Sequence, residues 1–179
     1  MLGVMERPAE LPVAEVPDAR ATAHEKLVIF AWSGDLDRVW PTLILATTAA
    51  ASGMATTVFF TFWGLFPLVR EDRRITGTGW MQKMLSVMNR GGIGHLKLSK
   101  LQMFGAGSGM MKLLAKQHQV ASPAELLASA IELGVKLIPC QMTMDLMGLT
   151  KADLIEGIEE PAGAMTALLD AKDAVTLFI

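Results

Sequence analysis

Residues 39–69 carry no charged side chain, and a run of this length could cross a bilayer as one helix. The run is interrupted, because residues 49–53, three alanines followed by Ser52 and Gly53, are typical of a helix end. Residues 56–62 are β-branched and aromatic, as in a strand. A strand covered on both faces in a parallel sheet is apolar throughout. We therefore predict a helix, a turn and a buried strand here rather than a membrane span.

Strands and helices alternate along the rest of the chain. Apolar runs predict further strands over residues 26–32, 135–139 and 174–179. Helices are predicted over residues 36–51, about 80–90, 110–118, 123–133, 141–148, 150–157 and 162–171. Repeated strand–helix–strand units with right-handed crossovers form a mostly parallel sheet with helices on both faces. Ligand sites in such sheets lie beyond the carboxyl ends of the strands.

Capping residues mark two of these helices. Asp35 directly precedes the helix predicted over residues 36–51 and is placed to cap it. Residues 122–125, Ser-Pro-Ala-Glu, form a capping box with proline at the first helical position, and Gly134 ends that helix. These signals set the borders of both helices.

The chain of 179 residues is long enough for one domain with a substantial core. Residues 1–25 contain three prolines and no continuous apolar run, so we expect an extended or mobile arm rather than a secretory signal. Residues 26–179 are expected to form a single α/β domain. The net charge of −2 offers no broad attraction for nucleic acid. We expect a cytoplasmic protein without a nucleic-acid partner, and only a peripheral membrane contact stays open.

A glycine-rich excursion spans residues 91–109. Its Gly105-x-Gly107-x-Gly109 spacing resembles a phosphate-cradling turn, but no clear strand precedes it and no acidic ribose partner can be assigned. Flexibility or a close backbone approach explains the glycines equally well. The three histidines lack the spacing of metal ligands. We therefore assign no cofactor and no metal.

Cys140 is the only cysteine, and it follows the strand predicted over residues 135–139. Backbone N–H groups of the next helical segment favour a thiolate at such a position. A reactive thiol is thus one hypothesis, and an inert core residue is the other. With one cysteine, the chain cannot form an internal disulfide.

Residues that follow different strands are expected to share one rim with Cys140. The candidate site residues there are Ser33, Gly34, Asp35, Trp63, Gly64, Gly105, Gly107, Gln141 and Met142. Trp63 could shield the thiol from water, while a nearby Asp35 would raise its pKa unless the carboxylate caps a helix. Met142, Met144 and Met147 are expected mainly to fill gaps in the packing.

Five segments together resemble the longer, single-cysteine branch of the DsrE/DsrF/DsrH-like proteins. They are residues 34–37, 60–65, 104–107 with Met110 and Met111, 140–148, and 174–179. The resemblance covers about residues 26–179. It implies a three-layer α/β sandwich with a mostly parallel five-stranded sheet, flavodoxin/DsrE-like, and assembly into a homo-oligomer.

The same resemblance implies a sulfur carrier that holds sulfane sulfur on a cysteine as a persulfide or thiosulfonate. Only Cys140 can take that role, so the sulfur donor and acceptor must be proteins or small sulfur compounds outside this subunit. Two alternatives stay open. One is a small-molecule-binding or regulatory oligomeric module without catalysis, and the other is a structural subunit with an inert thiol.

Overall fold

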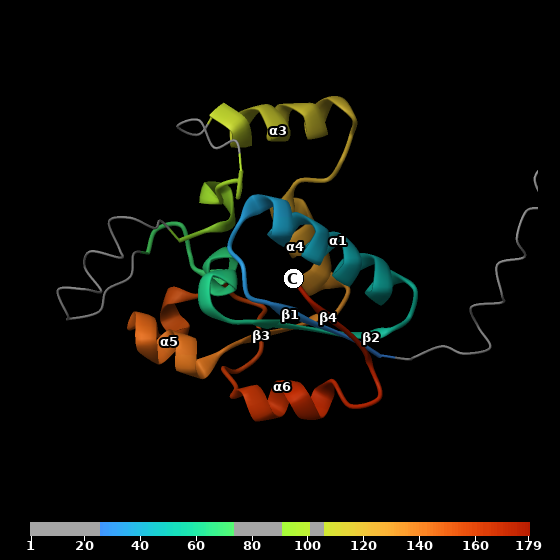
Figure 1. Ribbon diagram of the computed structural model, residues 1–179, viewed down its shortest axis with the longest axis vertical. Helices are drawn as coiled ribbons and strands as arrows, with labels where there is room; N and C mark the ends of the chain where they lie inside the picture. The colour runs from blue at the N-terminus through green and yellow to red at the C-terminus, as the bar shows by residue number, and fades with distance from the viewer. Residues whose placement is uncertain (1–25, 74–90, 101–105) are drawn as a thin grey trace, which may run out of the picture.

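A computed structural model of the chain describes residues 26–73, 91–100 and 106–179 (Figure 1). The expected N-terminal arm and the helix predicted near residues 80–90 lie outside these ranges, as does Gly105.

Four parallel strands form one sheet within the described ranges. They are β1 (Lys26–Ala31), β2 (Ala55–Phe60), β3 (Lys136–Pro139) and β4 (Val175–Phe178), in the order β3-β2-β1-β4. The parallel sheet is confirmed, but the expected five strands are corrected to four. Each of the four was predicted from its own residues, whereas the fifth was implied by the resemblance alone. The chain leaves β2 in a 3₁₀ helix and β3 in an α-helix, so neither connection begins with another strand.

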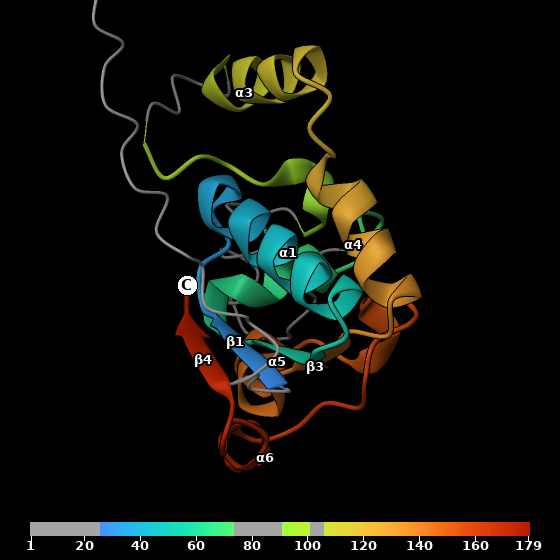
Figure 2. The same ribbon diagram turned by 90° about the vertical axis from the view of Figure 1, so that its right-hand side faces the viewer.

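Helices lie on both sides of the sheet (Figures 1 and 2). On one face are α1 (Leu36–Ala51) and α4 (Pro123–Glu132), and on the other is α6 (Ala164–Asp170). The short helix α5 (Gln141–Met147) follows β3 directly. In both views α3 (Ala106–Gln117) lies beyond α1 and α4, away from the sheet.

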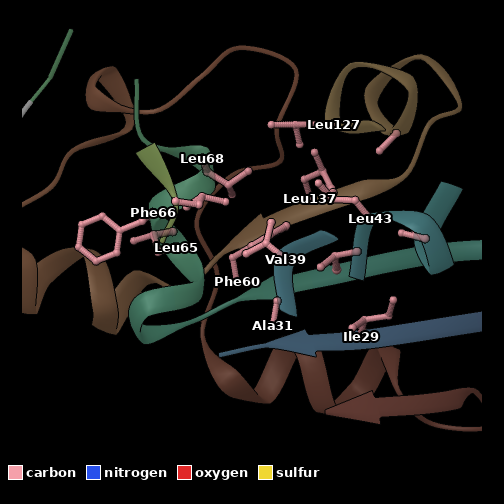
Figure 3. Close-up of a cluster of buried hydrophobic side chains, with 14 of the residues drawn as sticks. Ile29, Ala31, Val39, Leu43, Phe60, Leu65, Phe66, Leu68, Leu127 and Leu137 are labelled. Carbon is pink, nitrogen blue, oxygen red and sulfur yellow. The ribbon is translucent and has the colours of Figure 1, made fainter. Parts of the chain in front are cut away.

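Alternate side chains of each strand point to opposite faces, which gives two cores of unequal size. The larger core, under α1 and α4, receives Ile29, Phe60 and Leu137 from three strands (Figure 3). The smaller cluster lies on the α6 face and consists of Phe59, Ile138, Cys140 and Ala167, with Phe30 packed against it. Cys140 thus belongs to the thinly covered face of the sheet.

The uncharged run divides as the sequence predicts, into α1, a turn and β2, but the strand ends at Phe60 rather than residue 62. The 3₁₀ helix η1 (Phe62–Leu68) follows, and its first residue, Phe62, has a positive φ of 48°, which an extended strand cannot accommodate. Among the described residues, no helix is long and apolar enough to cross a membrane.

The helices α4 and α1 begin with different side-chain contacts. The capping box before α4 is confirmed, because the Ser122 hydroxyl accepts from the Glu125 N–H and the Glu125 carboxylate accepts from the Ser122 N–H. Asp35 does occupy the N-cap position of α1, but its carboxylate makes no capping hydrogen bond and instead accepts from the Ser33 hydroxyl at 3.0 Å. The Ser33 hydroxyl, two residues away, therefore competes successfully with the first N–H groups of α1 for the Asp35 carboxylate.

The glycine-rich excursion contains more helix than expected. The short 3₁₀ helix η2 (Ile93–His95) lies within it, and α3 begins at Ala106 rather than near residue 110. Gly107 and Gly109 are therefore helical, which contradicts their interpretation as part of a phosphate-cradling loop. Glycine costs a helix about 1 kcal/mol per residue, so it disfavours the helix without forbidding it. Downstream, the helix predicted over residues 150–157 is only the 3₁₀ turn η4 (Lys151–Asp153).

Candidate functional site

The backbone of Cys140 is fixed from both sides. Its N–H donates to the Phe60 carbonyl at 2.9 Å, which continues the pairing between β2 and β3. Directly beyond it, the Gln141 N–H donates to the Ala162 carbonyl, which ties this point to the segment before α6. Cys140 is also the N-cap residue of α5. The thiol is therefore at the carboxyl end of β3, as the sequence predicts.

Cys140 is buried, with only 5% of its surface exposed, although a reactive thiol needs access to its partners. One side of it packs in the apolar cluster with Phe59, Ile138 and Ala167. Cys140 lies in the smaller core because it continues the alternation of β3, on the same face of the sheet as Ile138. A reagent can therefore reach the sulfur more easily after a local displacement of its neighbours.

The other side of Cys140 is polar. Thr143, one turn further along α5, is buried, and its hydroxyl accepts from the Phe62 N–H at 3.0 Å. The hydroxyls of Thr61 and Thr143 are 3.2 Å apart. Because the Thr143 oxygen already accepts from Phe62, its own proton is available for another acceptor. The two threonines therefore form a hydroxyl pair between the end of β2 and the first turn of α5.

This hydroxyl pair acts on the charge of the thiol. Burial by itself raises the pKa of Cys140, but hydrogen bonds from the Thr143 hydroxyl and N–H, the Thr61 hydroxyl and the Met142 N–H outweigh it, so the pKa lies below its usual value. The N–H groups of Met142 and Thr143 contact the thiol, but the Cys140 side chain makes no regular capping hydrogen bond with α5. Among these hydrogen bonds, the one from the Thr143 hydroxyl lowers the pKa most, and the site favours a nucleophilic sulfur at lower pH than a free cysteine.

A Thr143→Val variant is expected to raise the pH at which Cys140 becomes reactive. Valine keeps the shape of threonine but removes the donor, and a hydrogen bond to a charged group contributes roughly 1.5–3 kcal/mol. At neutral pH, alkylation by iodoacetamide should slow about tenfold or more, with the midpoint of the rate against pH shifted upward. Thr143→Ser, which restores a hydroxyl, should return the midpoint towards wild type. An unchanged midpoint in Thr143→Val would show that the hydroxyl does not act on the thiol.

The residues after β1 are held within their own turn. The Ser33 hydroxyl, itself buried, donates to Asp35 and accepts from the Asp35 N–H at 3.2 Å. Gly34 packs against the next turn, since an added Cβ there would lie 2.5 Å from the Trp63 carbonyl oxygen. None of the described hydrogen bonds links these three residues to Cys140.

Trp63 and Gly64, after β2, have evident packing roles. The Trp63 ring stacks on Phe66 with a centroid separation of 5.7 Å and is partly exposed. Gly64 is buried against the Ala31 carbonyl, and its N–H donates to the Trp32 carbonyl at 3.0 Å. Close contact between the first two strand-ending turns thus accounts for both glycines, Gly34 and Gly64.

The residues after Cys140 divide into buried and exposed members. Gln141 is exposed, and its side-chain amide donates to Asp145 at 2.7 Å. Met144 and Met147 are buried in the larger core, which confirms their predicted packing role, but Met142 is 71% exposed. With Phe62, Trp63 and Leu146, Met142 belongs to a set of exposed apolar side chains on α5 and the start of η1.

Other predicted residues lie elsewhere. Gly107 is in α3, which both views place away from α5, the helix that Cys140 precedes (Figures 1 and 2). Over residues 26–73, 91–100 and 106–179, no group of three or more His, Cys, Asp or Glu side chains could hold a metal ion.

Thr61 is the site residue that sequence reasoning missed. It directly follows β2, at the same sheet end as Cys140, and this position was a usable signal. Thr143 stands three residues after the cysteine, and this spacing was a second usable signal. Because that spacing places a residue over the start of a helix, Thr143 could have been given more weight.

Comparisons with known proteins agree on one family. Residues 23–178 match the DsrE/DsrF/DrsH-like family. The uncharacterized protein YrkE of Bacillus subtilis (strain 168) is 38% identical over 159 residues, which cover 88% of this chain and 98% of YrkE. The sulfur carrier protein DsrE2 of Allochromatium vinosum (strain ATCC 17899) is 36% identical over 165 residues, which cover 87% of this chain and 99% of DsrE2.

A solved structure has the same fold. The ychN protein of E. coli superimposes with a TM-score of 0.50 at 17% identity, covering 86% of this chain and 98% of ychN. At this identity the similarity concerns the fold alone.

Proposed function

Because this chain belongs to the DsrE/DsrF/DrsH-like family, we propose that it is a sulfur carrier that holds sulfane sulfur on Cys140. The observation that carries the proposal is the lowered pKa of this thiol beside the hydroxyls of Thr61 and Thr143. The similarity to a protein named as a sulfur carrier supports the same role. A cysteine kept only for packing has no need of two hydroxyl groups on one side.

Loading is a thiol exchange that needs no separate oxidant. The Cys140 thiolate attacks the outer sulfur of a polysulfide or persulfide donor, a new S–S bond forms, and the donor's own S–S bond breaks. The electron pair of that bond leaves on the donor thiolate. With thiosulfate as donor, sulfite is the leaving group. The product in each case is a persulfide on Cys140.

Unloading reverses the roles of the sulfur atoms. An acceptor thiolate attacks the outer sulfur, and the Cys140 thiolate leaves with the electron pair of the broken bond. The hydrogen bonds that favour the thiolate as a nucleophile also make it a better leaving group, because the leaving thiol has a lower pKa. One arrangement of threonines therefore assists both half-reactions.

The burial of the thiol fits a carrier that protects its cargo. Thr61 and Thr143 bridge the end of β2 and α5, so a small displacement of either element would open the sulfur to a partner. The acceptor would then meet the exposed side chains of Phe62 and Met142, whose backbone N–H groups contact Thr143 and Cys140. Since the chain has no second cysteine, donor and acceptor are other molecules or another subunit of the expected homo-oligomer. A cytoplasmic location and a single domain over residues 26–179 complete the proposal.

Intact-mass spectrometry of the wild-type protein tests the proposal. After treatment with polysulfide or thiosulfate, we expect a mass increase of one sulfur atom, located on the peptide that contains Cys140 and removed by dithiothreitol. Alkylation with iodoacetamide beforehand should block the increase. A loaded sample mixed with a small acceptor thiol should lose the sulfur to it.

Two results would contradict the carrier role. One is the absence of any sulfur uptake by folded protein, together with slow alkylation that follows an ordinary thiol pKa, which would indicate an inert structural residue. The other is a small molecule that stays bound to the purified chain after Cys140 has been alkylated, without sulfur uptake beforehand. That result would favour the non-catalytic binding module.

A further inference from the structure

Helix α3 turns its apolar side chains to solvent. Met110, Leu113 and Leu114 recur at helical spacing and are at least half exposed, Met110 by 67% and Leu113 by 59%. Met111 beside them is exposed as well. A helix of a globular protein normally buries such a stripe, so this one lacks an apolar partner among the described residues.

The opposite side of α3 faces the body of the protein. Lys112 donates to the Gly94 carbonyl at 2.9 Å. Together with Lys116 it lines a cavity of about 640 Å³ between α3 and the start of α4. Figures 1 and 2 place α3 at the outside of the molecule, beyond α1 and α4. Lys112 and Ala115, which packs against the larger core, thus attach the helix, and its apolar stripe faces outward.

Basic residues are concentrated in the part of the sequence that contains α3. Residues 73–124 contain eight of the 16 Lys and Arg residues of the chain and none of its 18 Asp and Glu residues. Lys97, Lys100 and Lys116 in this segment are exposed. A net charge of −2 therefore conceals a basic segment that contains the exposed helix.

We infer that α3, together with the exposed Lys97, Lys100 and Lys116, binds the surface of a lipid bilayer with anionic headgroups. A helix with an apolar face and a lysine-containing polar face is suited to lie in the plane of the membrane interface, where the lysines attract anionic lipids. With 12 residues, α3 is about 18 Å long, too short to cross a hydrocarbon core of about 30 Å. The contact is therefore peripheral.

Other occupants of the stripe fit less well. A second copy of the chain would bring two basic segments together, and like charges oppose such pairing. A nucleic acid would satisfy the lysines but leave the methionines and leucines without an apolar partner. The stripe also lacks the Trp, Tyr and Arg anchors that dominate protein interfaces.

Co-sedimentation of the full chain with vesicles provides the test. We expect binding to vesicles of equal amounts of phosphatidylcholine and phosphatidylglycerol, little binding to phosphatidylcholine alone, and weaker binding as salt rises. Leu113→Glu should lower the partition coefficient roughly tenfold or more, because it removes an apolar side chain from the interface. Lys116→Glu should lower it at least about fivefold, since each basic residue near the surface contributes about 1 kcal/mol.

Matched variants on α6 and the following turn provide controls. Leu168 is 59% exposed, as is Leu113, so Leu168→Glu tests for a general effect of an added charge. Lys172→Glu, at another exposed lysine, tests for a general effect of charge reversal. Both should bind as wild type does, as should Cys140→Ser, because contact between α3 and lipid does not depend on the sulfur chemistry.

Three outcomes would overturn the inference. They are the absence of binding to either vesicle, equal loss in the α3 and α6 variants, and a change of oligomeric state in Leu113→Glu without a change in vesicle binding. If neither vesicle is bound, an acidic protein surface becomes the candidate partner of the apolar stripe. Circular dichroism verifies that each variant is folded. If Leu113→Glu does not fold, Lys116→Glu still tests the inference.

Discussion

The Cys140→Ser variant is expected to take up no sulfur from polysulfide or thiosulfate, at any pH at which the protein stays folded. A serine hydroxyl is not appreciably ionised in this pH range and cannot form the S–S bond that holds the cargo. The chain has no other thiol to substitute for Cys140. Loss of uptake should therefore be complete rather than partial, and intact-mass spectrometry measures it directly.

The fold of this variant should be preserved. Serine is close to cysteine in size and is a favoured N-cap residue, so it suits the first position before α5. Its hydroxyl can also take the hydrogen bonds of Thr61 and Thr143. The free energy of unfolding should change by no more than about 1 kcal/mol, as measured by urea titration. Sulfur uptake by folded Cys140→Ser would place the cargo on another group and end the carrier proposal.

The strand ends show how far the sequence could predict this site. Cys140 lies at the end of β3 because the apolar run before it is a buried strand, and the parallel order brings the turn after β2 beside it. Both follow from local patterns and from the connection rules for parallel sheets. The position of the thiol on the rim was therefore predictable.

The environment of the thiol was not predictable in the same way. Whether Cys140 is exposed depends on Ala162 and Ala167, which approach from the segment before α6 and from α6 itself. Its pKa depends on Thr61, which is remote in sequence and acts through a side-chain contact. Tertiary packing of this kind leaves no periodic signal in the chain. Asp35 is a local case instead, because its carboxylate is taken by Ser33, two residues away.

Gly64→Ala is expected to destabilise the protein by about 3 kcal/mol or more. An added Cβ would lie 2.1 Å from the Ala31 carbonyl oxygen and 2.6 Å from its carbon, and both atoms belong to backbone that is fixed in β1. Relief of this clash would move the turn that begins η1 away from β1 and weaken the hydrogen bond from the Gly64 N–H to the Trp32 carbonyl. The midpoint of urea unfolding should fall accordingly.

The same displacement should reach the thiol, because the turn that holds Gly64 also contains Thr61 and Phe62, which are bonded to Thr143. Alkylation of Cys140 in Gly64→Ala should therefore show a pH midpoint shifted upward, even under conditions in which nearly all molecules are folded. Gly109→Ala is the matched control, since its added Cβ would meet open space among the described residues outside its own helix, and the site is inside α3. Removing a helical glycine should stabilise by roughly 0.5–1 kcal/mol and leave the alkylation profile unchanged. Equal stability of Gly64→Ala and wild type would show that the two strand-ending turns are not packed as closely as described. An unchanged pH midpoint in a destabilised Gly64→Ala would instead separate the stability of this turn from the reactivity of the sulfur.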